Sequence, residues 1–152
     1  MVIYLLLLLT TQSFAAAQEP SKESASAEVY EAVIRYQIKS WDLAASSYCI
    51  SINGKDATGD FLKRFASLPV QGASGCIKKT TQKALTRVVD KKTGQPSVIF
   101  AVRAIRWLSK DEAEIEGGYL CGSLCMASGK YHVLRDGMRW VVTKFDISVQ
   151  SS

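Results

Sequence analysis

Apolar residues follow one helical pattern near the start of the chain and strand-like patterns over the rest. From Val29 to Trp41 they recur every three or four residues, which predicts an amphipathic helix capped by Ser26. A short strand at 48–52 and a short helix at 61–67 are expected next. Further strands are expected at 84–90, 97–108, 112–126, 130–135 and 138–150.

Two features of these strands predict a curved sheet. Segment 97–108 is apolar on both faces near its start, as a central strand is. Gly117, Gly118 and Gly122 interrupt the next strand, and glycine marks kinks and bulges. The order of elements predicts an α+β fold, with one N-terminal amphipathic helix packed on a curved antiparallel sheet of four to five strands. We expect one domain over 28–152.

The first residues form an apolar segment of their own. Residues 2–9 are uninterrupted apolar side chains, too few for a membrane-spanning helix, which needs about 20. The small residues Ala15-Ala16-Ala17 follow, as a signal peptidase requires, although no Lys or Arg precedes the segment. We therefore expect a signal peptide at 1–17 and a flexible tether at 18–27. The protein would then be exported, periplasmic or secreted, with no stable membrane span after cleavage.

Charge adds a surface property to this picture. The net charge is +5, and its densest stretch holds Lys78-Lys79, Lys83 and Lys91-Lys92. Threonines rather than aromatic residues separate these lysines, so nucleic acid is not an expected partner. A solvated surface is the favoured interpretation. A basic exported protein can also attract anionic lipid headgroups, polysaccharide or acidic partners.

The four cysteines predict disulfides in an exported chain. Three pairings exist, and we favour Cys49–Cys76 with Cys121–Cys125. On a regular strand Cys121 and Cys125 would lie about 13 Å apart, whereas a disulfide needs Cα atoms within about 7 Å. Either the chain bends sharply at Gly122-Ser123, or these two cysteines pair elsewhere. A less favoured alternative is a metal site made by Cys121, Cys125 and His132, with Asp136 as a fourth ligand.

His132 is the only histidine and therefore the one weak candidate for a catalytic base, beside an acid such as Asp136 or Asp146. A lone strand histidine is more often a structural residue. No serine-hydrolase, zinc-protease or phosphate-loop motif occurs in the sequence. The alternating acids Glu112, Glu114 and Glu116 are expected to form an exposed row that pairs with Arg103 or Arg106 across the sheet. No cofactor is expected.

Aromatic residues recur in the predicted helix and in the later strands. They form either an aromatic core, the favoured interpretation, or the lining of a ligand pocket between helix and sheet. The candidates for that pocket are Tyr30, Tyr36, Trp41, Trp107, Tyr119 and Trp140.

The element order resembles the cystatin-like superfold and, within it, the nuclear transport factor-like cone. Segment 116–142 is similar to a C-terminal pattern of uncharacterised exported bacterial proteins, in which a Gly-Gly-Tyr strand, Cys-Gly-x-Leu-Cys and a Tyr-x-Val strand precede Asp-Gly-x-x-Trp-Val-Val. The resemblance implies a fold and an envelope location, and no activity. A cystatin-type inhibitor would carry Gln-x-Val-x-Gly, which segment 70–75 does not fit.

These observations favour a non-catalytic exported binding domain for a small apolar ligand or for an envelope or protein partner. A small cone-fold enzyme that uses His132 with a nearby acid is one alternative. A dimerising structural subunit is another, because cone folds pair through the outer sheet face. Trp107 and Trp140, if exposed there, would mark the interface of such a homodimer.

Overall fold

The computed structural model describes residues 21–41, 45–80 and 85–151. The expected signal peptide lies outside this part of the chain. The described elements are the helix α1 (Lys22–Trp41), the strands β1 (Ser47–Ile52) and β2 (Lys55–Asp56), the helical turns α2 (Gly59–Leu62) and η1 (Lys63–Phe65), the strand β3 (Val70–Gly72), the turn η2 (Ala73–Gly75), and the strands β4 (Cys76–Thr80), β5 (Thr86–Asp90), β6 (Ser97–Trp107), β7 (Glu112–Gly122), β8 (Cys125–Asp136) and β9 (Arg139–Ser151).

Helix α1 begins earlier than the Ser26 cap predicts. Ser21 Oγ accepts a hydrogen bond from the backbone N–H of Ser24 at 3.2 Å, which is how a capping serine satisfies a free N–H of the first turn. Ser26 instead donates its hydroxyl to the Lys22 carbonyl, one turn back, at 2.8 Å. Residues 22–27, which were expected to belong to a tether, are therefore the first turns of the helix.

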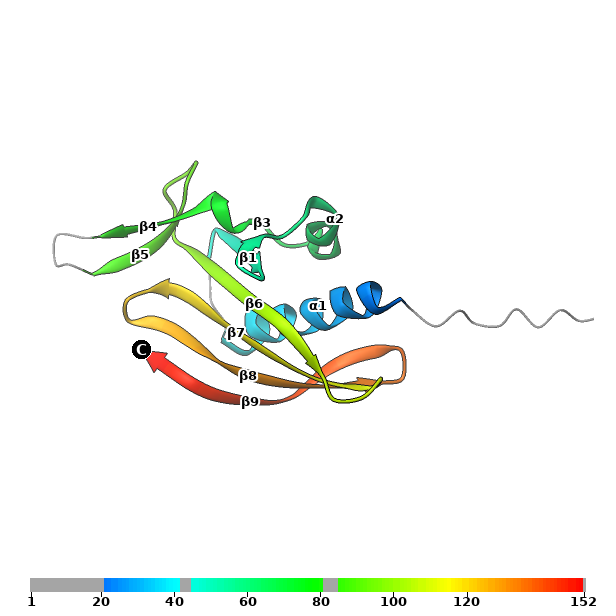
Figure 1. Cartoon of the computed structure of the whole chain (residues 1–152). Coiled ribbons are helices and arrows are strands. Elements are labelled where there is room, and N and C mark those ends of the chain that lie inside the picture. The colour runs from blue at the N-terminus through cyan, green and yellow to red at the C-terminus, as the bar shows by residue number, and fades with distance from the viewer. Residues whose placement is uncertain (1–20, 42–44, 81–84, 152) are drawn as a thin grey trace, which may run out of the picture.

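The sheet is strongly curled and wraps around α1 (Figure 1). The α+β class and the curvature agree with the prediction, but a sheet of four to five antiparallel strands was wrong. The sheet has nine strands and is mixed. Strand β1 pairs in parallel with β6, from Ser47 opposite Ser97 to Ile52 opposite Val102. It also pairs in parallel with β3.

The predicted strand 112–126 is in fact two strands. Chain reversal at Ser123-Leu124 ends β7 and starts β8, and Gly122 pairs with Cys125. Ser123 donates its backbone N–H to the Thr86 carbonyl at 2.9 Å, and its hydroxyl accepts the Thr86 N–H at 2.8 Å. A Cβ on Gly122 would lie only 2.7 Å from the same carbonyl. The turn is therefore fixed by close contact with the start of β5.

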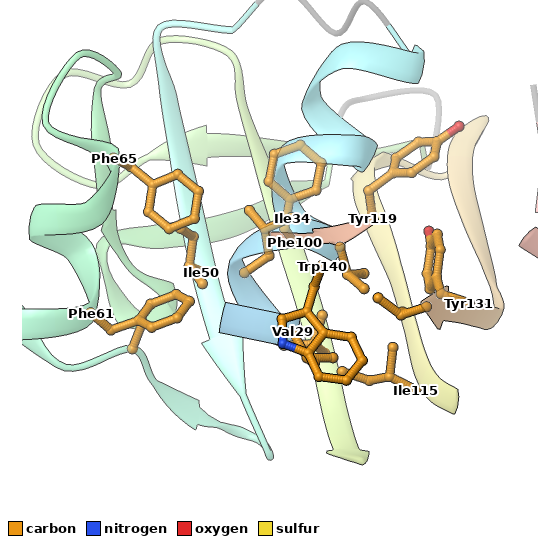
Figure 2. Packing of buried hydrophobic residues seen from close by; sticks show 14 of the residues in the cluster. Val29, Ile34, Ile50, Phe61, Phe65, Phe100, Ile115, Tyr119, Tyr131 and Trp140 are labelled. Atoms are coloured by element: carbon orange, nitrogen blue, oxygen red, sulfur yellow. The ribbon is translucent and has the colours of Figure 1, made fainter. Parts of the chain in front are cut away.

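The main core lies between α1 and the concave face of the sheet (Figure 2). Helix residues Val29, Val33 and Ile34 are fully buried. They belong to one cluster with Phe100 from the central strand β6 and Tyr131 from β8. Alternate residues of a strand point to opposite faces. The residues directly before and after Phe100 on β6, and before and after Tyr131 on β8, therefore lie on the outer face of the sheet, away from α1.

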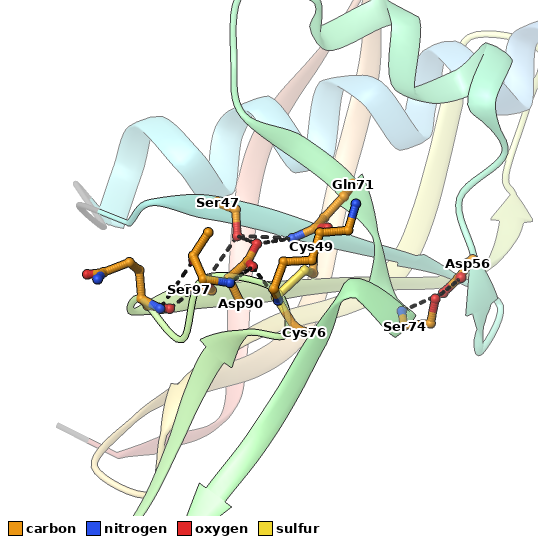
Figure 3. The surroundings of a disulfide bond; sticks show 11 residues. Ser47, Cys49, Asp56, Gln71, Ser74, Cys76, Asp90 and Ser97 are labelled. Atoms are coloured by element: carbon orange, nitrogen blue, oxygen red, sulfur yellow. Dashed lines mark hydrogen bonds between the residues drawn. A yellow bond between two sulfur atoms is a disulfide. The ribbon is translucent and has the colours of Figure 1, made fainter.

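A second, smaller core covers part of that outer face. The hairpin of β4 and β5 brings Cys76 and Val88 against Cys49 of β1, and Ile99 and Leu120 pack against them. The disulfide between Cys49 and Cys76 joins the hairpin to the sheet, with a Cα–Cα distance of 6.1 Å. Figure 3 shows this bond beside the polar side chains of β1 and β3.

Candidate binding site on the hairpin and the outer face

Asp90, the last residue of β5, forms hydrogen bonds that connect the base of the β4–β5 hairpin to its neighbours (Figure 3). Its side chain is only 8% exposed. One carboxylate oxygen accepts the backbone N–H groups of Lys92 and Thr93, each at 2.8 Å. The other accepts the Gln71 amide at 2.7 Å and the Ser47 hydroxyl at 3.1 Å. These hydrogen bonds, first that from the Thr93 N–H, hold the pKa of Asp90 far below its ordinary range.

We expect the stability that this carboxylate gives to the folded state to decrease at acidic pH. A group with a lowered folded-state pKa stabilises the fold above its unfolded pKa, which is about 3.9 for Asp, and this stabilisation is lost as the pH falls. In Asp90→Asn the new amide nitrogen would face the Gln71 amide, donor against donor. The melting temperature of the variant should lie about 5 °C below that of the wild type at pH 7. This difference in melting temperature should become smaller as the pH is lowered toward 2.

The exposed pair Asp60–Lys63 provides the control, because surface ion pairs contribute little. Thermal melts of Asp60→Asn should follow the wild type at every pH. A gap between Asp90→Asn and wild type that stays constant from pH 7 to pH 2 would contradict the assignment.

Residues 76–95, which comprise the β4–β5 hairpin and the turn after β5, carry the whole net charge of the protein. Residues 76–95 hold six of the nineteen basic residues and one of the fourteen acidic ones. The rest of the chain has thirteen of each and is neutral. The one acid in the segment is Asp90, whose carboxylate is buried and fully hydrogen-bonded. The described basic side chains of this segment are all exposed, and none forms an ion pair with another described residue: Lys78, Lys79 and Arg87 on the hairpin, and Lys91 and Lys92 in the turn after β5.

Two exposed leucines lie near these charges. Leu85 immediately precedes β5 and is 38% exposed, and Leu124 in the β7–β8 turn is 60% exposed. Both line one cleft of about 690 Å³ that Arg87 also lines. The hydrogen bonds between Ser123 and Thr86 hold the two leucine-bearing segments side by side. This end of the molecule therefore places two exposed apolar side chains beside a cationic one.

A groove of about 550 Å³ runs over the outer face beside β4. Its floor includes Ile99, Leu120 and Met126, which are half-buried. Lys78, Arg103, Glu116 and Lys130 line it as well. The groove thus offers apolar surface between charged side chains, three of them cationic.

A network of charged side chains continues from the groove across β6 to β9. Glu114 is 9% exposed and forms ion pairs with Arg106 and, at 3.4 Å, with Lys130. The Arg106 hydrogen bond is the main reason that the pKa of Glu114 is lowered. The prediction that this acidic row pairs with Arg106 is confirmed for Glu114, although this carboxylate is buried rather than exposed.

His132 lies between two carboxylates of this network. Its Nε2 is 2.8 Å from Asp146 Oδ2, and its Nδ1 is 3.4 Å from Glu114 Oε1. Asp146 also pairs with Lys144 at 2.7 Å, and the Lys144 and His132 contacts lower the pKa of Asp146. Of the two acids considered for a catalytic pair, the structure therefore brings Asp146, and not Asp136, into contact with the ring.

The cysteines are joined as favoured, Cys49 to Cys76 and Cys121 to Cys125. The β7–β8 reversal supplies the sharp bend that the second pair needs, with a Cα–Cα distance of 5.2 Å. Because both sulfur atoms of Cys121 and Cys125 are used in this bond, they are not thiolate ligands beside His132. No group of three or more His, Cys, Asp or Glu side chains within the described residues has the arrangement of a metal site.

The predicted aromatic pocket residues pack mainly into the core. Tyr119 and Trp140 are buried, and Tyr30, Tyr36 and Trp107 pack partly buried against the main cluster. Trp107 contacts Trp140 at a ring distance of 5.6 Å. The side chain of Trp41 lies outside the described part of the chain. Trp140, being only 7% exposed, does not mark an exposed dimer interface.

Sequence reasoning found the basic stretch but missed the groove beside it. Lysine clustering at 78–92 was visible in the sequence. The groove depends on β4 lying over the outer face, and segment 76–80 was not predicted as a strand. The paired sheet positions of Ile99 and Leu120 provide a signal only once the strand register is known.

Within the described residues, no helix is both long enough and apolar enough to cross a bilayer. The two disulfides are of the kind that persists in oxidising compartments. Comparison of the chain with protein-family models, curated proteins and solved structures finds no match.

Proposed function

We propose that this protein is an exported, non-catalytic domain that binds an anionic lipid surface of the cell envelope through its β4–β5 hairpin. The observation that carries the proposal is the charge distribution, because the entire net charge lies in residues 76–95. Each Lys or Arg held near an anionic bilayer contributes about 1 kcal/mol of attraction. Such a surface suits a segment that has three described, exposed and unpaired cations on the hairpin and two more in the turn after β5.

The two exposed leucines support a lipid partner over a purely ionic one. Leu85 and Leu124 lie beside Arg87 at the same end of the molecule. Apolar side chains beside a cation can enter the boundary between headgroups and acyl chains while the charge contacts the headgroups. An acidic polysaccharide would use the charges and leave these leucines exposed to water.

Three contacts hold the strands β4 and β5 to the domain, so binding would not require these strands to become ordered. They are the Cys49–Cys76 disulfide, the Asp90 hydrogen bonds and the small core around Val88. A preorganised surface avoids part of the entropy cost of binding. His132, by contrast, is engaged by two carboxylates on the outer face, which favours a structural role. We also propose that the curled sheet with its helix is a fold of the nuclear transport factor-like cone type, as the sequence resemblance implies.

Co-sedimentation with lipid vesicles tests the proposal. The protein should bind vesicles that contain phosphatidylglycerol and should not bind pure phosphatidylcholine. Lys79 and Arg87 are paired across the hairpin, so Lys79→Glu/Arg87→Glu should weaken binding at least tenfold, and added salt should weaken wild-type binding. The control Lys55→Glu/Lys110→Glu makes the same charge change at exposed sites outside the hairpin.

Two outcomes would overturn the proposal. One is a wild-type protein that ignores anionic vesicles at low salt. The other is an equal loss of binding in the hairpin variant and in the control, because net charge alone, rather than the hairpin, would then decide the binding.

A further inference from the structure

The outer groove lies beside the proposed lipid-binding hairpin and shares Lys78 with it. Its volume of about 550 Å³ lies in the usual range for small-molecule sites, about 300–1,000 Å³. The lining runs about 13 Å along β6 from Ile99 to Arg103 and extends across β7 to Met126 of β8, so the groove is large enough for a flexible acyl chain.

The floor of the groove is apolar. Ile99 on β6, Leu120 on β7 and Met126 on β8 are neighbours across three strands, since Ile99 pairs with Leu120 and Leu120 with Met126. All three are half-buried and line the groove. Covering this surface with an acyl chain would remove apolar area from water, which is favourable.

Cations in the lining of the groove can hold an anionic head. Lys78 and Arg103 are exposed and form no ion pair with a described residue. Lys130 is engaged by Glu114 at 3.4 Å. Glu116 is the one carboxylate in the lining, and it would repel an anion. Lys78 and Arg103 together carry more positive charge than Glu116 carries negative charge. The lining therefore attracts a negative head.

We propose that this groove binds a single-chain anionic amphiphile, with its acyl chain along Ile99, Leu120 and Met126 and its head at Lys78 and Arg103. This inference rests on the proposed function, because the lipid surface would supply the ligand. A carboxylate head would identify a fatty acid, and a phosphate head would identify a lysophospholipid-type lipid. Either head pairs with the guanidinium of Arg103.

Titration calorimetry below the critical micelle concentration tests the groove without vesicles. The probes are dodecanoate, dodecyl phosphate and dodecanol. At least one anion should bind, and dodecanol should bind at least tenfold more weakly. The preferred anion indicates which of the two sources supplies the head. Binding by neither anion, or equal binding of dodecanol and both anions, would overturn the proposal.

Variants locate the ligand within the groove. Lys78→Glu/Arg103→Glu should weaken binding of the anion at least tenfold, and Glu116→Gln should strengthen it about threefold. Ala101→Trp fills the lining from β6 and should abolish binding. Met126→Trp should do the same from β8 and guards against misfolding of the first variant. Lys79→Glu, next to Lys78 but outside the lining, should bind normally.

An acidic peptide is the competing occupant. If poly-glutamate binds, and if its binding is lost in Arg103→Glu but unaffected in Ala101→Trp, the lipid assignment is wrong.

The groove proposal and the hairpin proposal can also fail separately. Ala101→Trp should still sediment with anionic vesicles, and Lys79→Glu/Arg87→Glu should still bind dodecanoate or dodecyl phosphate. Loss of one activity in both variants would show that the two sites are not independent and would overturn the groove assignment.

Discussion

Replacement of Tyr131 by Ala should lower the free energy of unfolding by about 4 kcal/mol, because truncation of a large buried aromatic side chain leaves a cavity. Tyr131 has no exposed surface. Its ring stacks on Phe145 at 4.1 Å and meets the edge of Tyr36 at 5.9 Å. Its hydroxyl accepts a hydrogen bond from the buried Gln37 amide at 3.1 Å. Urea unfolding of the oxidised protein measures the loss.

The matched control is Tyr131→Phe, which keeps the ring and removes the hydroxyl. The Gln37 amide oxygen already has no hydrogen-bond partner among the described residues. Without the tyrosine hydroxyl, its nitrogen would lose its partner too, at a cost of about 1–2 kcal/mol. Equal losses for the Phe and Ala variants would show that the hydrogen bond, and not ring packing, dominates at this position.

Removal of the Cys49–Cys76 disulfide should cost about 3.5 kcal/mol. The bond closes a loop of 27 residues, and the entropy of closing a loop in the unfolded chain rises with its length. We expect Cys49→Ala/Cys76→Ala to show this loss in urea unfolding. Because the same bond holds the hairpin to β1, the variant should also bind anionic vesicles more weakly than wild type.

Cys121→Ala/Cys125→Ala is the internal comparison. These residues are four positions apart, so the same entropy argument gives only about 2 kcal/mol. The hydrogen bonds between Ser123 and Thr86 should keep the β7–β8 turn in place. A larger loss from this pair than from Cys49–Cys76 would mean that loop length does not set the stabilisation.

The helix α1 and the central strand β6 could be predicted because the spacing of apolar residues within each segment marks them. The helical spacing of Val29, Val33 and Ile34 matches the buried face of α1, and the apolar start of 97–108 matches the central position of β6. The short helix expected at 61–67 matches the helical turns α2 and η1 in part, but the strands between residues 53 and 80 were not predicted. Strands β2 and β3 have two and three residues, too few to show an alternating pattern. They become strands only because β1 provides a partner.

The candidate site was predicted in its composition but not in its geometry. Basic residues of the hairpin stand out in the sequence, but their position over the outer face depends on the Cys49–Cys76 bond and on Asp90. The contact of His132 with Asp146 depends on register, since Lys130 rather than His132 lies directly opposite Asp146. A bulge beside His132 shifts this pairing, and a bulge leaves no reliable mark in one sequence.

The parallel pairing of β1 with β6 constrains the order in which the chain can assemble. Partners in this ladder, such as Ser47 and Ser97, are 50 positions apart. A strand made early in synthesis must therefore wait for a partner made much later, whereas β7, β8 and β9 can join their neighbours as each hairpin forms. Pairings between distant segments form slowly because the intervening chain must first be ordered. Until β6 arrives, β1 exposes Ile50 and an unpaired edge, so this early strand is where a nascent chain is most open to wrong partners.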